Sequence, residues 1–165
     1  HDIYLIGVTL HELGGSFYHI VSNETGGVPP RVDTGLAPKI FAAVHRAIAE
    51  GLIRACHDLS EGGLAVAVAE MAFAGGVGAD LALASMPEDL SDHAKLFSES
   101  CTRFVVEVKP ENSAKLEACF AGLPLAKIGV TTKEDRLRVS GANGEWLIWA
   151  KLAELKEAWQ KPLRG

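Results

Sequence analysis

The chain has 165 residues and a formal net charge of −5, from 16 Lys and Arg against 21 Asp and Glu. This length suits a single domain, residues 1–165, with a real core, and the 48% of hydrophobic residues argues against intrinsic disorder. The basic residues are scattered and no apolar run approaches the ~20 residues of a membrane span, so we expect neither a nucleic-acid nor a membrane partner. Three cysteines without CxxC spacing predict reduced thiols and a cytoplasmic location.

Strands and helices are predicted to alternate irregularly along the chain, from the spacing of its apolar residues. The predicted strands are 3–10, 53–57, 77–84, 103–108, 125–131, 136–139 and 146–149. The predicted helices are 36–50, 62–73, 87–97, 110–121 and 150–159. Turns between the last strands are too short for parallel crossovers. The pattern therefore predicts an α/β chain of the α+β type, with one mixed, largely antiparallel sheet and packed helices.

The stretch HDLSEGGL (57–64) lies between a predicted strand and a predicted helix. Asp58 and Ser60 have oxygens that can cap the helix, and Gly62 and Gly63 allow close approach of the backbone to a partner. Because free helix N-termini attract anions, a phosphate could bind Ser60 and the following amides, with Asp58 facing a Mg²⁺ ion. Simple capping of an apolar helix explains the same residues equally well.

Two further polar motifs flank predicted strands. The segment ELGGS (12–16) follows the first strand and is most simply a sharp turn. The segment SESCTR (98–103) opens another strand, where Glu99, Ser100 and Arg103 could hold a polar ligand, since the arginine fork suits phosphate or carboxylate. The alternative is a charged turn with Glu99 and Arg103 paired on the surface. Cys101 has no basic cluster nearby in sequence to activate it as a nucleophile.

Taken in order, these motifs resemble those of phosphoribosylformylglycinamidine synthase, and more narrowly the last domain of its synthetase subunit. The resemblance is carried by GVTLHELGGSFY (7–18), by HDLSEGGL with the following AVAVAEM (57–71), and by FSESCTRFVVEV (97–108). The wider superfamily includes aminoimidazole ribonucleotide synthetase and selenophosphate synthetase, whose C-terminal domains share this fold. A synthetase of another substrate in that superfamily is one alternative, and a non-catalytic nucleotide-binding or assembly module is another.

The resemblance implies an ATP-dependent carbon–nitrogen ligase of purine biosynthesis. Such an enzyme converts formylglycinamide ribonucleotide and glutamine-derived ammonia to formylglycinamidine ribonucleotide, with ATP/ADP and Mg²⁺ as cofactors. By that similarity Asp58 would bind Mg²⁺, and Asp58, Ser60, Gly62 and Gly63 would contact the nucleotide. The substrate contacts would come from the segment 99–103, through Glu99, Ser100 and Arg103.

The same resemblance implies that the chain is a fragment of a longer multidomain protein. The catalytic histidine of the family and most of its ATP-binding residues lie in other domains, so no catalytic residue is expected here and the fragment alone is expected to be inactive. The implied partners are an upstream ATP-binding domain of the same chain and a glutaminase subunit or domain. An apolar surface left exposed by the missing domain would favour self-association of the fragment.

Overall fold

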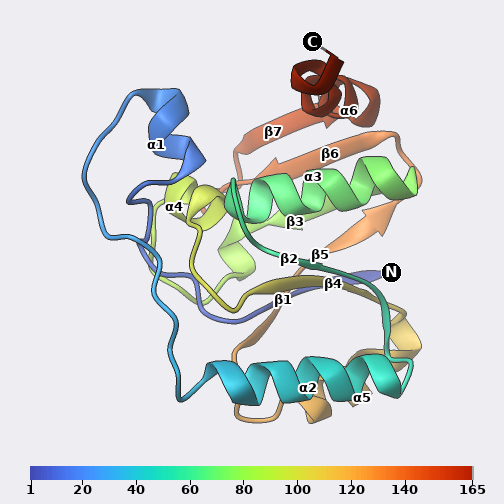
Figure 1. Cartoon of the computed structure of the whole chain (residues 1–165). Coiled ribbons are helices and arrows are strands. Elements are labelled where there is room, and N and C mark those ends of the chain that lie inside the picture. Colours follow the sequence, from blue (N-terminus) through green and yellow to red (C-terminus); the bar gives the residue numbers. More distant parts are fainter. Residues whose placement is uncertain (165) are drawn as a thin grey trace.

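A seven-stranded sheet forms the centre of the molecule in a computed structural model, which describes residues 1–164 (Figure 1). Its strands lie in the order β2-β4-β1-β5-β3-β6-β7. Their bounds are β1 (Asp2–Ile6), β2 (Ile53–Asp58), β3 (Gly78–Ala82), β4 (Phe104–Val108), β5 (Leu125–Thr132), β6 (Arg136–Ser140) and β7 (Trp146–Lys151). Neighbouring strands are antiparallel except for β3 and β6, which are parallel. The predicted mixed, largely antiparallel sheet is therefore confirmed.

Helices cover both faces of this sheet. They are α1 (Phe17–Ser22), α2 (Ala37–Ala49), α3 (Gly63–Gly75), α4 (Asp92–Phe97), α5 (Ser113–Cys119) and α6 (Leu152–Gln160), with 3₁₀ turns at 83–85, 110–112 and 161–164. Figure 1 shows α3 and α6 on one side of the sheet and α2 and α5 on the other. None of the helices in residues 1–164 has the length and apolar character needed to cross a membrane.

The central strand β1 divides the hydrophobic core into two layers. All five of its residues are buried. Its side chains alternate, so that Ile3 and Leu5 join the core beneath α3, whereas Tyr4 and Ile6 join the core beneath α2 and α5. A strand buried on both faces reads as a continuous apolar run, and this explains the sequence IYLI.

The first strand is shorter than the predicted 3–10 because the chain turns at Gly7, which has a φ of +95°. A Cβ at this position would lie 2.5 Å from the carbonyl oxygen of Thr102, so only glycine fits. The predicted helix at 87–97 begins only at Asp92, and the strand predicted from 77 to 84 ends at Ala82. Helix α1 lies where the sequence predicted no element, and it begins where the buried Ser16 hydroxyl accepts the N–H of His19.

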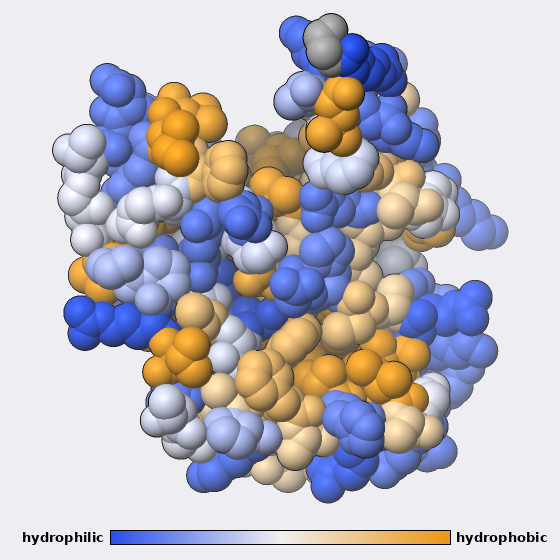
Figure 2. Space-filling view, in the orientation of Figure 1, coloured by the Kyte–Doolittle hydropathy of each residue, from blue (hydrophilic) through white to orange (hydrophobic). Residues whose placement is uncertain are grey.

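One part of the surface lacks a covering layer. On the side of α2, the strands β5, β3, β6 and β7 carry a row of paired residues, Val130, Asp80, Arg138 and Trp149, and this side of the four strands is called the open face below. Val130 and Trp149 are 40% and 50% exposed. An exposed apolar area lies over α1 (Figure 2), where Phe17, Ile20 and Val21 are all more than half exposed.

Candidate functional site

The three sequence motifs meet in space at one end of strands β1, β2 and β4. The segments 9–16, 57–63 and 98–103, called the loop junction below, are held together by the carboxylate of Glu99. Its Oε1 accepts the backbone N–H of Phe17 at 3.0 Å and that of Gly62 at 2.9 Å. The Glu99 N–H in turn donates to the carbonyl oxygen of Glu12 at 3.2 Å. Residues far apart in the sequence thus form one structural unit.

Helix α3 starts without a side-chain cap. Its N-cap residue is Gly62 in the left-handed conformation, so capping by Asp58 or Ser60, the alternative interpretation, does not occur. Gly63 is also left-handed, and a Cβ there would lie 2.5 Å from the Ser98 carbonyl oxygen. The two glycines are therefore needed for close approach between the first turn of α3 and the segment 98–103.

A carboxylate of the protein itself already stands at the N-terminus of α3. Glu99 accepts from the Gly62 amide, where the positive end of the helix dipole favours an anion. Gly62 and Gly63 lie buried beside it, whereas Asp58 and Ser60 are exposed on the preceding turn. An anion arriving from solvent would therefore meet Asp58 and Ser60 before any helix amide. That these residues contact nucleotide stays a prediction.

Arg103 is the most deeply enclosed charged side chain of the loop junction, with 1% exposure. Its guanidinium donates to the Ser100 carbonyl oxygen at 3.1 Å, to Thr9 Oγ1 at 3.1 Å and to the Ser98 carbonyl oxygen. Burial lowers its pKa to about 10, although the nearby carboxylates of Glu88 and Glu12 act in the opposite direction. The surface ion pair between Glu99 and Arg103 is therefore wrong: Glu99 binds backbone amides, and Arg103 binds neutral oxygens inside the fold.

Ser100 joins the first and third motifs. Its buried hydroxyl accepts the Leu10 N–H at 3.0 Å. Beside it a small cleft of about 180 Å³ opens between the segments 8–12, 31–40 and 100–102. Glu12, Arg31, Asp33 and Cys101 line this cleft, and so does Ser100, one of the predicted substrate contacts. Whether Glu99, Ser100 and Arg103 contact substrate stays a prediction. The Glu99 carboxylate, the Ser100 hydroxyl and the Arg103 guanidinium all make hydrogen bonds within the protein.

The predicted Mg²⁺ site has one candidate ligand in this chain. Across residues 1–164, no group of three His, Cys, Asp or Glu side chains is placed to hold a metal ion. The Asp58 carboxylate is 70% exposed and lies 3.6 Å from His57 Nδ1. Magnesium is often held by one or two carboxylates together with phosphate oxygens and water. Asp58 fits that mode as a single ligand, with the rest of the coordination supplied from outside the chain.

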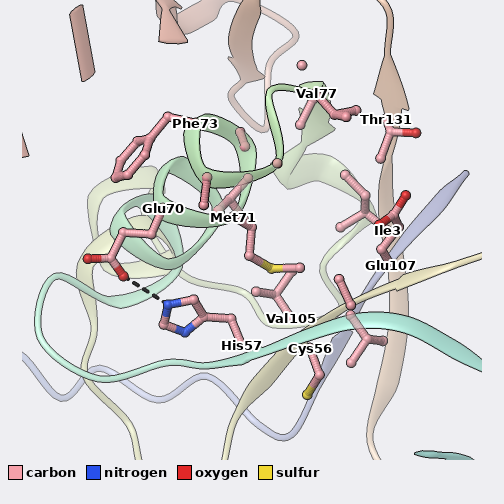
Figure 3. A pocket seen from close by; sticks show the side chains of 18 of the residues that line it. Ile3, Cys56, His57, Glu70, Met71, Phe73, Val77, Val105, Glu107 and Thr131 are labelled. Atoms are coloured by element: carbon pink, nitrogen blue, oxygen red, sulfur yellow. Dashed lines mark ion pairs between the residues drawn. The ribbon is translucent and has the colours of Figure 1, made fainter. Parts of the chain in front are cut away.

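A larger groove, of about 540 Å³, lies on the other side of the HDLSEGGL motif, between α3 and the sheet (Figure 3). His57 points into it from β2, and its Nε2 pairs with Glu70 Oε2 at 2.9 Å. The other oxygen of Glu70 accepts the indole N–H of Trp159 at 2.7 Å. One carboxylate on α3 therefore ties β2 to α6, and His57 has a structural partner.

Sequence reasoning missed Glu70 and Thr9 because their partners lie far away in the chain. The Trp159 indole is 89 residues from Glu70, and Arg103 is 94 residues from Thr9. Glu70 did carry a local signal, since it is the sole charged side chain within the apolar helix sequence GLAVAVAEMAFAG. A lone carboxylate in such a helix indicates a specific partner.

Comparison with known proteins identifies the domain type. Residues 2–142 match the family model described as "AIR synthase related protein, C-terminal domain". Among curated proteins, the chain is 40% identical over 165 residues to phosphoribosylformylglycinamidine synthase subunit PurL of Synechocystis, covering 97% of this chain and 21% of that protein. The subunit PurL of Acidiphilium cryptum is 41% identical over 158 residues, covering 95% and 21%. The chain thus spans about a fifth of the length of these relatives.

Solved structures show the same fold. The structure of Thermotoga maritima PurL complexed with FGAR superposes with a TM-score of 0.81 at 20% identity, covering 93% of this chain and 27% of that one. Hydrogenase maturation protein HypE in complex with ATP superposes with a TM-score of 0.63 at 13% identity, covering 91% and 50%.

Proposed function

Because the chain belongs to the family of AIR synthase related proteins, as their C-terminal domain, we propose that it is this domain of a phosphoribosylformylglycinamidine synthase. The intact protein would be an ATP-dependent ligase that forms formylglycinamidine ribonucleotide in purine biosynthesis. Support comes from curated relatives at about 40% identity over nearly the whole chain. As the chain spans 21% of their length, the other domains would supply the catalytic residues, and the isolated domain would be inactive.

The observation that carries the proposal is the convergence of the three motifs on Glu99. Its carboxylate fixes the first turn of α3 against α1 and leaves Asp58 and Ser60 exposed on the adjoining turn. Rigid support by hydrogen bonds is what a binding residue on a loop requires. The loop junction would thus hold Asp58 and Ser60 toward a nucleotide bound at the boundary with a neighbouring domain.

The nucleotide would be ATP or ADP, as in the structures of Thermotoga maritima PurL complexed with each of them. A Mg²⁺ ion accompanying the phosphates would neutralise their charge, and Asp58 would supply one oxygen to it. Gly62 and Gly63 would act indirectly, by permitting the tight start of α3. Glu99 and Arg103 would order the segment that carries Ser100, next to the cleft proposed for substrate.

The proposed partners follow from the domain organisation. An ATP-binding domain of the same longer chain would complete the nucleotide site, and a glutaminase would deliver ammonia. The free thiols of Cys56, Cys101 and Cys119 fit a cytoplasmic enzyme. The isolated domain would self-associate through its exposed apolar residues, among them those of α1.

Substitution of Asp58 in the full-length protein tests the proposal. Asp58→Ala should weaken binding of ADP with Mg²⁺ at least tenfold without lowering the melting temperature, because the side chain is exposed and makes no helix cap. Glu61→Ala, on the exposed residue three positions later, is the matched control and should bind normally. Unchanged ADP binding by Asp58→Ala would instead assign the domain a purely architectural role.

A further inference from the structure

The groove between α3 and the sheet has a volume of about 540 Å³, and apolar side chains dominate its wall. Met71 reaches from α3 toward Val105 on β4, and Val77 closes one end (Figure 3). Val77 is 43% exposed and Trp159, at another edge, is 48% exposed. Such a volume falls in the range of about 300–1,000 Å³ typical of clefts that bury a ligand.

The polar groups of the groove are already satisfied, which argues against a small polar ligand. His57, Glu70 and Trp159 form the chain of contacts described above. The second nitrogen of His57, Nδ1, contacts the Asp58 carbonyl oxygen at 2.6 Å. Small-molecule sites usually need a few free polar groups to fix the orientation of the ligand. A wall without them suits the apolar side chains of a polypeptide.

The first residue of the chain lies at the rim of this groove. His1 Nδ1 lies 2.5 Å from Glu107 Oε1, and the backbone nitrogen of His1 donates to Thr131 Oγ1 at 2.7 Å. Glu107 and Thr131 both line the groove. Polypeptide joined to His1 in a longer protein would therefore start its path at the groove itself.

We propose that the groove is the seat of the polypeptide segment that leads from the preceding domain into β1. The family is by its description a C-terminal domain, and relatives of the chain are about five times as long, so a preceding segment is expected. Apolar side chains of that segment would cover Met71, Val77 and Trp159. This would fix the orientation of the domain relative to its neighbour, because the link between them would be packed instead of free.

The proposal rests on the domain organisation in the proposed function but not on the ligase activity. A photoreactive benzoylphenylalanine placed at Val77 in the full-length protein tests it directly. The same probe at Leu147 is the matched control, since Leu147 is also 43% exposed but lies on β7, the last strand of the sheet. We expect a cross-link from position 77, and not from position 147, to peptides immediately preceding His1, identified by mass spectrometry.

Hydrogen exchange provides a second measurement that does not depend on cross-linking. Val77→Asn should speed amide exchange in the segment preceding His1 about tenfold, while Leu147→Asn should leave it unchanged. Cross-links from position 77 to another domain or to a second copy would overturn the proposal, as would no cross-link at all. Absence of synthase activity from the unsubstituted full-length protein, with the cross-link formed as expected, would instead count against the proposed function alone.

Discussion

Two arginines, Arg103 in the loop junction and Arg138 on the open face, show how differently this fold uses the same side chain. Arg103 is 1% exposed and its described partners are neutral oxygens. Arg138 forms two hydrogen bonds of 2.5 Å with the Asp80 carboxylate and one of 2.9 Å with Glu134. It also stacks over Trp149, 5.2 Å from the ring centroid.

The pKa values of the two guanidinium groups move in opposite directions. Burial lowers the pKa of Arg103, whereas the hydrogen bonds to Asp80 raise the pKa of Arg138. Inside the loop junction the cation is therefore kept for its geometry, because one guanidinium ties Ser98, Ser100 and Thr9 together at once. On the open face the charge itself is the reason for the contact, and solvent and salt can weaken it.

Removal of the buried guanidinium should have the largest effect. Arg103→Met leaves the carbonyl oxygens of Ser98 and Ser100 without their charged donor, and we expect the free energy of unfolding to fall by about 3–5 kcal/mol. Urea denaturation of the two variants Arg103→Met and Arg138→Met measures the contrast. A loss from Arg103→Met of under about 0.5 kcal/mol, the range of ordinary surface substitutions, would mean that the loop junction does not depend on this side chain.

Neutralising the carboxylate that joins the three motifs should have an intermediate effect. Glu99→Gln keeps the shape but weakens two charge-assisted hydrogen bonds, to the amides of Phe17 and Gly62, so we expect a loss of about 1–2 kcal/mol. Faster hydrogen exchange in α1 and at the start of α3 would show where the loss acts. Glu61→Gln, on a neighbouring exposed side chain, should leave both quantities unchanged, and a similar loss there would contradict the assignment.

The contrast between the two regions also explains what the sequence could predict. Helix α2 repeats its apolar residues at helical spacing, whereas α3 is a long, nearly continuous apolar run, which is typical of a buried helix. The class of the fold and helices near 36–50 and 62–73 were therefore predictable. Helix α1 was not predictable, because six residues are too few to show a helical repeat of apolar residues. Its packing depends instead on a distant residue, since the ring centroids of Tyr18 and Phe97 lie 5.1 Å apart.

Burial of a charged residue was equally invisible in the sequence. In SESCTR a carboxylate and a guanidinium four positions apart suggest a surface pair, and local spacing contains nothing to oppose that. The acceptor Thr9 comes from a segment 94 residues earlier, which only the pairing of β1 with β4 brings near Arg103. The motifs of the site were thus predictable, but the roles of their side chains depended on contacts between distant segments.

The acid sensitivity of Asp2, on strand β1 beside the open face, offers a smaller test. Asp2 pairs with Val130 in the sheet, and its Oδ1 lies 2.8 Å from Lys127 Nζ. Burial alone would raise the pKa of Asp2, but hydrogen bonds from Lys127 and Ser113 outweigh it, and the pKa is lowered. This stabilisation is therefore present above the unfolded value of 3.8 and is lost as the pH falls through the lower folded value.

Melting temperatures measured from pH 7 to pH 2 check that expectation. Asp2→Asn should be less stable than the unsubstituted chain at pH 6, and the difference should shrink as the pH falls through the lowered pKa of Asp2, because protonation removes the charge of that side chain. A difference between Asp2→Asn and the parent that persists at pH 2 would show that packing, not charge, is responsible.

The smallest expected change in stability is the effect of salt, which should differ between Arg103→Met and Arg138→Met. The Arg138 ion pairs lie at the surface, and raising the ionic strength from about 0.1 M to 1 M shortens the Debye length from about 10 Å to about 3 Å. The destabilisation caused by Arg138→Met should therefore shrink in 1 M NaCl, leaving the part due to stacking on Trp149. The destabilisation caused by Arg103→Met should stay nearly constant, because solvent ions do not reach a guanidinium with 1% exposure. Urea titrations of both variants at the two salt concentrations, each referred to the parent chain, give the comparison. An equal response to salt would mean that the loop junction opens to solvent in the native state.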